Sequence, residues 1–340
     1  MHGIRTIVAL VLMAPFALAQ ADELYLKNGS KLIGSLVRSE SDFVIFKTPF
    51  AGDINVKQSN VDRIVTDTNV IVMLNDGTVY RDQRIDAEGG QLVARGDTGV
   101  SEAFEATDIR YINPEPWRLG EGYKWSGEAS VAAEFERGNS DTDEWDIAGQ
   151  TVWRSLVDRY TIKGDFERDR NNGRKTDDNW EVRSKYDRFS KSDERNYWGG
   201  KLRLEYDRFA DLDLRTILGP HIGRQFLDTP RLAFHGEIGP VYVDEQFDEA
   251  EDNDFPGALW EGGATSDIVG FGSTLYLNHD GILNFDDPED LILNTTLGLK
   301  FPLILGFEAG VQAKWEYDGG APEDIDELDE TYTFRLGYAW

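Results

Sequence analysis

The chain contains no cysteine and only four histidines and three methionines among its 340 residues. Without cysteine it has no thiol nucleophile, no disulfide and no cysteine-ligated zinc. Basic residues are also scarce, because 35 Lys and Arg stand against 63 Asp and Glu, a formal net charge of −28. Binding to nucleic acid needs clustered cations on the phosphates, so the composition argues against such a partner.

Long hydrophobic runs are missing beyond the N-terminus. The one apolar stretch, Thr6–Leu18 or "TIVALVLMAPFAL", is shorter than the ~18 residues that a membrane-spanning helix needs. Arg5 precedes it and the small residues of "ALAQA" follow, as in a secretory signal peptide with its cleavage site. We therefore predict a signal peptide over residues 1–21, and any later membrane span must be a barrel.

Two short segments near the N-terminus repeat one hairpin pattern. "YLKNGSKLIG" and "MLNDGTVY" each place Asn-Gly or Asp-Gly between apolar residues, which is the strongest local signal for a tight hairpin. Leu26 and Val61 recur as Leu74 and Ile109, both 48 positions later. Such self-similarity indicates an internal duplication. We predict two small β modules of the SH3-like or Sm-like type, with either a spacer role or a periplasmic binding role.

The modules are expected over residues 22–66 and 67–113. The stretch "INPEPWRLGEG" then breaks the pattern, because two prolines within three residues remove backbone donors and disfavour strand and helix alike. We predict a linker over residues 114–122 and a second domain over residues 123–340.

In this second domain apolar residues recur at every second position. Trp125, Ala129 and Val131 form one row, while Glu128 and Ser130 form the other. Twelve such segments follow one another, each of about ten residues, as in transmembrane β-strands that face lipid on one side and a lumen on the other. A soluble sandwich alternates too. The connections decide the matter, since short turns alternate with long acidic loops such as "DEQFDEAEDNDFPGA".

The predicted fold is therefore all-β: a 12-stranded antiparallel transmembrane β-barrel preceded by two small SH3/Sm-like β modules. The last segment, "ETYTFRLGYAW", supplies the closing strand. Its lipid-facing row consists of Tyr332, Phe334, Leu336, Tyr338 and Trp340. A terminal strand that ends on an aromatic residue resembles the signal that the barrel-assembly machinery reads.

Several strings carry a family resemblance. "GNSDT", "NYWGGKLRLEYDRFADLDLRTILGPHIG" and the final strand together resemble an uncharacterised family of outer-membrane β-barrels, the salt-induced outer membrane proteins. The resemblance covers roughly residues 123–340 and does not include the N-terminal repeats. It implies a location in the outer membrane of a Gram-negative bacterium, with the N-terminal modules in the periplasm. It implies no activity, because none is established for the family.

The alternation predicts which charged side chains point into the lumen. They are Lys163, Arg183, Lys185, Lys201, Arg203, Glu205, Arg215, His221, His235, Glu237, Lys314 and Arg335. One interpretation is a narrow diffusion pore with a charged constriction. The other is a ladder of salt bridges that fills the lumen, because buried charges must be paired or hydrated.

A catalytic interpretation rests on two histidines. His221 and His235 lie on adjacent segments, and counting from the hairpin places them opposite or one step apart, with Glu237 near. A membrane-embedded hydrolase is therefore one alternative, although no Ser stands at a matching depth. His279 is expected at the start of a long loop. We expect no enzyme, no catalytic residue and no cofactor.

The acidic segments suggest partners. Asp141, Asp143 and Glu144 are weak candidates for a metal site, since they lack the spacing of a known Ca²⁺ loop. We expect contacts with outer-membrane lipid, with lipopolysaccharide through divalent cations, and with the barrel-assembly machinery. The predicted function is a structural role in the envelope, with narrow channel activity through the lumen. The alternatives are the hydrolase and a periplasmic scaffold that binds a partner through the N-terminal repeats.

Overall fold

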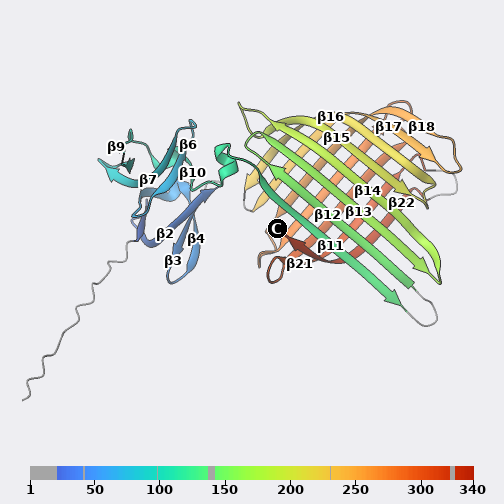
Figure 1. Cartoon of the computed structure of the whole chain (residues 1–340), viewed down its shortest axis with the longest axis horizontal. Coiled ribbons are helices and arrows are strands. Elements are labelled where there is room, and N and C mark those ends of the chain that lie inside the picture. Colours follow the sequence, from blue (N-terminus) through green and yellow to red (C-terminus); the bar gives the residue numbers. More distant parts are fainter. Residues whose placement is uncertain (1–20, 41–42, 98, 137–141, 230, 322–325) are drawn as a thin grey trace, which may run out of the picture. The chain divides into compact units, whose positions relative to one another are not determined.

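The computed structural model describes residues 21–340 except 41–42, 98, 137–141, 230 and 322–325. The chain divides into two compact units, one ending at Pro114 and one from Glu115 to Trp340 (Figure 1). The predicted signal peptide, apart from Ala21, lies outside the described residues. Within the described part of the chain, no helix is long and apolar enough to cross a membrane.

The first unit is built from short antiparallel strands and two 3-10 turns. Its strands are β1 (Asp22–Leu26), β2 (Lys31–Glu40), β3 (Phe43–Thr48), β4 (Gly52–Lys57), β5 (Val61–Val65), β6 (Val70–Leu74), β7 (Val79–Glu88), β8 (Gln91–Gly96), β9 (Gly99–Val100) and β10 (Ile109–Ile112). The turns are η1 (Gln58–Asn60) and η2 (Ala106–Asp108).

The same strand pairings occur twice in this unit. β1 pairs with β2 and β5, and β6 pairs in the same way with β7 and β10. The pair Leu24↔Ile64 has its counterpart in Val72↔Ile112, 48 residues later on both strands. A bridge between Ser39 of β2 and Ile112 of β10 joins the halves. Buried side chains from both halves form one core, so the repeats fold as a single unit.

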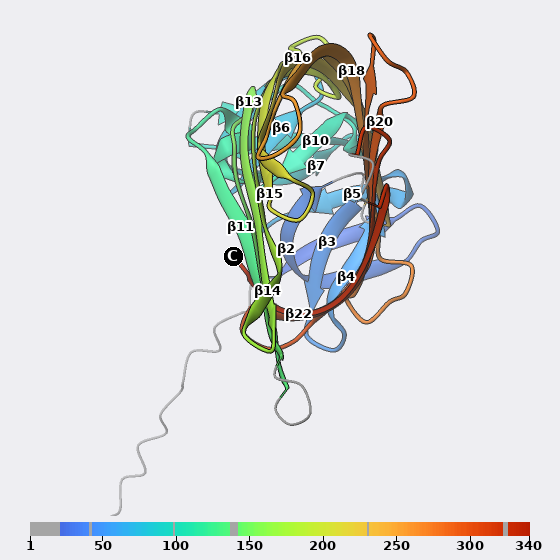
Figure 2. The same ribbon diagram turned by 90° about the vertical axis from the view of Figure 1, so that its right-hand side faces the viewer.

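The second unit is a closed antiparallel barrel of twelve strands, which confirms the predicted fold class (Figures 1 and 2). Its strands are β11 (Lys124–Glu136), β12 (Thr142–Arg154), β13 (Asp158–Asn171), β14 (Arg174–Phe189), β15 (Asn196–Asp207), β16 (Leu212–Thr229), β17 (Leu232–Phe247), β18 (Asn253–Ser266), β19 (Thr274–Asn284), β20 (Leu291–Pro302), β21 (Phe307–Asp318) and β22 (Leu328–Ala339). β22 pairs with β11 and closes the barrel, so the C-terminus lies beside β11, the first strand of the barrel (Figure 1).

The two faces of the barrel wall differ in the sense expected for a membrane. Outward apolar side chains are exposed, for example Trp198 at 60% and Tyr332 at 70%. Inward charged groups are buried, and Asp187 and Glu237 are 0% and 5% exposed. A soluble sandwich would bury its apolar face instead. An apolar outside around a polar inside is the arrangement of a transmembrane barrel.

The predicted contrast between long loops and short turns is wrong at several places. β13 ends at Asn171 and β14 begins at Arg174, so only Asn172 and Gly173 connect them, both with positive φ as a tight hairpin requires. The predicted loop over residues 244–258 shrinks to 248–252. Strand pairing continues through these polar segments, so polar composition does not mark the end of a strand.

Candidate functional site: the barrel lumen

The inward side chains fall into two groups. Lys163, Arg183, Arg203, Glu205, Arg215, Lys314 and Arg335 line a cavity of about 690 Å³. The short-turn end of the barrel is the end at which β11 begins and β22 ends. Lys185, Lys201, His221, His235 and Glu237 lie nearer the short-turn end, beside Asp187 and Glu261. The structure therefore places every predicted lumen charge on the inner face.

Arginine side chains cross the cavity. Arg183 Nη1 on β14 lies 3.0 Å from Asp280 Oδ1 on β19, and Arg203 Nη1 on β15 lies 2.8 Å from Asp280 Oδ2. Arg215 Nη2 on β16 donates to Asp318 of β21 at 2.6 Å. These strands are not neighbours, since β14 and β19 are separated by four strands. Charge-assisted bonds of this kind tie opposite walls together across the lumen.

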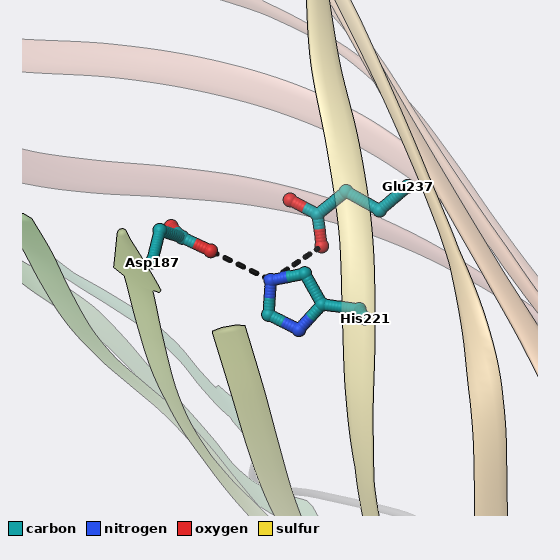
Figure 3. Close-up of side chains that lie close together, drawn as sticks. All are labelled: Asp187, His221 and Glu237. Atoms are coloured by element: carbon teal, nitrogen blue, oxygen red, sulfur yellow. Dashed lines mark hydrogen bonds and ion pairs between the residues drawn. The ribbon is translucent and has the colours of Figure 1, made fainter. Parts of the chain in front are cut away.

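A second cluster of charges lies toward the short-turn end of the lumen, and Figure 3 shows three of its members, Asp187, His221 and Glu237. His221 Nε2 lies 2.7 Å from Asp187 Oδ1 and 3.8 Å from Glu237 Oε2. Because Nε2 faces two carboxylates, it carries the hydrogen and donates to Asp187. Lys185 Nζ lies 2.6 Å from Glu237, and Arg159 Nε lies 2.6 Å from Asp187. Each buried carboxylate thus faces a cation, as burial of charge demands.

Two tilted aromatic rings and a guanidinium lie next to this cluster. The Arg154 guanidinium lies 3.4 Å from the centre of the Phe189 ring, which lies 5.2 Å from Tyr197. The linker turn η3 (Pro116–Leu119) places Trp117 5.5 Å from the same guanidinium. Cation–π contacts of this kind hold the linker against the barrel.

The linker's own carboxylate is fixed as well. Partial burial raises the pKa of Glu115, but hydrogen bonds from Lys124 and Trp117 outweigh it and hold the pKa below its usual value. Glu115 therefore stays ionised and anchors the start of β11.

One wall of the lumen is apolar, which the sequence patterning did not predict. Buried side chains from β16 to β20 form this cluster: Ile217, Val241, Val243, Phe255, Leu259, Ile282 and Ile292. The signal that could have found it is the loss of alternation in strings such as "PVYV", where both faces are apolar, as in strands buried on both sides. Together with the ion pairs, this cluster leaves the lumen partly filled.

The predicted opposition of His221 and His235 is wrong. The register pairs Ile222 with Ile238 and Gln225 with His235, so the two histidines lie four positions apart along the strands. β16 runs on to Thr229, which pairs with Leu232, so the turn lies further along the chain than predicted, and a bulge between Gln225 and Leu227 shifts the register by one more residue. Histidine 221 pairs with Asp187 instead.

The prediction for His279 is also wrong. It lies within β19 on the outer face, and its ring nitrogens contact Trp260 and Thr295.

Three groups of side chains have metal-ligand geometry among the described residues: Asp187, His221 and Glu237; His235, Glu237 and Glu261; and Glu167, Asp169 and Asp177. In the first two, Arg159, Lys185 and Lys201 already neutralise the carboxylates. The weak metal candidates Asp141 and the side chain of Asp143 lie outside the described residues, and Glu144 belongs to none of these groups.

Acids outnumber bases in the cavity lining. The described acidic residues there are Glu128, Asp146, Asp165, Glu167, Glu181, Glu205, Asp207, Asp280, Glu308, Glu316, Asp318, Asp326, Glu327 and Asp329. The described bases are Lys163, Arg183, Arg203, Arg215, Lys300, Lys314 and Arg335. Fourteen carboxylates against seven cations give the cavity a negative potential that attracts cations.

A family model described as "Protein of unknown function, DUF481" matches residues 129–340. No curated protein matches the chain. Among solved structures, the barrel is similar to the NanC porin, with 11% identity and a TM-score of 0.39 over 64% of this chain and 99% of that one. The outer membrane channel DcaP of Acinetobacter baumannii matches with 10% identity and a TM-score of 0.32 over 94% and 95% of the two chains.

Proposed function

The chain belongs to the DUF481 family of proteins of unknown function, and we propose that it is an outer-membrane barrel with a structural role in the envelope. Its lumen is closed at rest and passes small cations only at low conductance. The observation that carries this proposal is the bridge from Arg183 on β14 to Asp280 on β19, 3.0 Å long, across the barrel interior. Twelve strands enclose a width between the filled eight-stranded barrels and the open porins, so side chains of this length span it.

The membrane placement follows from the wall itself. Its outer face presents aromatic and aliphatic rows, and its inner face holds the charges. Because the number of strands is even, β11 begins and β22 ends at the same end of the barrel, the short-turn end. The linker, which precedes β11, therefore enters there. The predicted signal peptide exports the chain, so this proposal assigns residues 22–113, and with them the end of the barrel that the linker enters, to the periplasm.

Three partners complete the proposal. The barrel-assembly machinery reads β22, lipopolysaccharide phosphates bind the acidic end through divalent cations, and residues 22–113 meet a periplasmic ligand. Extraction by detergent that is the same with and without a chelator would count against the lipopolysaccharide contact.

An enzymatic role is not part of the proposal. Among the described side chains, no serine or threonine hydroxyl is hydrogen-bonded to His221, and the nearby Tyr197 hydroxyl donates to Glu237. A nucleophile within reach of its base is the minimum for covalent catalysis.

Conductance in planar lipid bilayers tests the closed lumen. We expect the purified full chain to give rare, small current steps, because the Asp280 bridges obstruct the path. Asp280→Ala removes the acceptor shared by Arg183 and Arg203, so we expect more frequent and larger steps.

Glu308→Gln is the matched control, since it removes a carboxylate that lines the same cavity but is no part of the bridges. Large steady currents through the unmodified protein would overturn the proposal. So would an Asp280→Ala variant that conducts no better than the control while folding normally.

A further inference from the structure

The outer face of the barrel carries a trench of about 820 Å³ that crosses β15 to β19. The strand register shows how it forms. One wall is the row Trp198↔Ile222↔Ile238↔Trp260. The next outward row is Arg224↔Gly236↔Gly262↔His279. Gly236 and Gly262 are neighbours in that row and have no side chains. The sheet surface is therefore low at these two positions, and they form the floor of the trench.

The opposite wall is also apolar. Phe226 and Phe234 stack with ring centres 5.4 Å apart, and Phe234 is followed across the sheet by Ala264 and Leu277. On the first wall Ile222 and Ile238 are 65% and 54% exposed. The trench is therefore long, apolar and open to the outside, which is the shape and chemistry of a hydrocarbon chain.

Hydrogen bonds hold Trp260, the last residue of the first wall, in place. Trp260 lies across Gly281, where any Cβ would overlap its ring. Its Nε1 donates to His279 Nε2 at 3.2 Å. Because Nε2 accepts, the other ring nitrogen carries the hydrogen and donates to Thr295 Oγ1 at 2.9 Å. In this tautomer His279 accepts from Trp260 and donates to Thr295. Its role is to hold the tryptophan in place.

The near end of the trench is cationic. Arg224 lies at the end of the floor, 3.3 Å from Asp193 in the turn between β14 and β15. Asp193 also accepts from Arg195 at 3.1 Å. The same turn also carries Lys191 and Glu194. With Arg224 included, three cations stand against two carboxylates, so one positive charge is left over at the level where lipid headgroups of the short-turn leaflet lie. An anionic headgroup complements this end, as it does at basic sites on membrane proteins.

We propose that this trench is a binding site for one anionic phospholipid, with an acyl chain along Gly236 and Gly262 and the phosphate beside Arg224. The site goes beyond the proposed function. It rests on the membrane placement and does not depend on whether the lumen is closed, so conductance results leave it untouched.

Native mass spectrometry of the folded full chain in detergent tests the site, with phosphatidylglycerol and phosphatidylcholine of identical chains as probes. We expect one phosphatidylglycerol to bind about tenfold more tightly than phosphatidylcholine, the effect of one charge-assisted contact. Equal affinity of the unmodified protein for the two lipids would overturn the proposal without any variant.

Two variants separate the chain from the headgroup. Gly262→Leu fills the floor, and its Cβ meets nothing closer than a carbonyl at 3.7 Å, so we expect a tenfold or greater loss of bound lipid. Gly164→Leu is the control, an outward glycine of β13 with its nearest atom at 3.6 Å. Arg224→Gln should keep one lipid but abolish the preference for phosphatidylglycerol. If Gly262→Leu binds lipid as Gly164→Leu does, the site is not where we place it.

Discussion

Asp187 is the most completely enclosed charge in the lumen, at 0% exposed. It accepts from His221 and Arg159 at once. Removing one member of a buried ionic group leaves the others uncompensated, which costs about 3–5 kcal/mol. We therefore expect Asp187→Asn to lower the free energy of unfolding by about that amount, measured by urea titration of tryptophan fluorescence in lipid vesicles.

Asp165→Asn is the control for this measurement. Its pair with Lys163 is 3.6 Å long, and the two side chains are 29% and 41% exposed. Such partly solvated pairs contribute about 0–1 kcal/mol. If both variants lose the same stability, burial of Asp187 within an ionic network is not what stabilises the barrel.

Which residues point inward was predictable, but their partners were not. Lys185 and Arg183 follow from period-two alternation alone, because successive side chains of a strand point to opposite faces. Their partners lie 52 and 97 residues away, on strands that only the closed barrel brings near. The pairing of His221 was predicted wrongly for another reason, because β16 continues past the predicted turn to Thr229, and a later turn changes every pairing in the hairpin.

The seam between β11 and β22 depends on the final residue. Trp340 N–H donates to Gly127 O at 2.9 Å, and Gly127 N–H donates back at 3.1 Å. The Trp340 ring lies over Gly127 and meets Trp125 edge-on, with centres 5.7 Å apart. β22 is thus held against β11 by the Trp340 side chain as well as by backbone hydrogen bonds.

We expect Trp340→Ala to reduce the fraction of barrel that folds into lipid vesicles, read as the band that shifts on heating in gel electrophoresis. Aromatic pairs contribute about 0.5–1.5 kcal/mol each, and Trp340 stacks on Tyr338 and contacts Trp125 edge-on. Trp340→Phe keeps a ring over Gly127 and should restore most folding. An alanine variant that folds as efficiently as the phenylalanine variant would show that the ladder alone closes the seam.

Strand identity was easier to predict than strand length. Every alternating segment became a strand, but β16 extends over 18 residues and β17 over 16. Asp244 and Glu245, predicted to start a loop, continue the ladder against Asp254 and Asn253. Glu245 is only 5% exposed and accepts from Arg215 inside the barrel, so an acidic residue here belongs to a strand and does not mark its end.

At the scale of the molecule, duplication and barrel closure were visible in the sequence, but the joining of the repeats was not. The recurrence of Leu26 as Leu74 reports a copied hairpin, because both turns close the same backbone bonds, Leu26 to Ser30 and Leu74 to Thr78. The bridge between β2 and β10 that merges the copies links Ser39 to Ile112. Edge pairing of that kind leaves no local pattern in either strand.

The charge of the whole cavity predicts the ions that cross the barrel once it is opened. Fourteen carboxylates face seven cations there, and a lumen lined by one sign of charge favours ions of the other sign. We expect currents through the Asp280→Ala variant to be cation-selective even though one carboxylate has been removed. Under a KCl gradient, the reversal potential should shift toward the equilibrium potential of K⁺. A shift toward that of Cl⁻ would mean that Arg183 and Arg203, freed from Asp280, control permeation, and that the acidic lining does not.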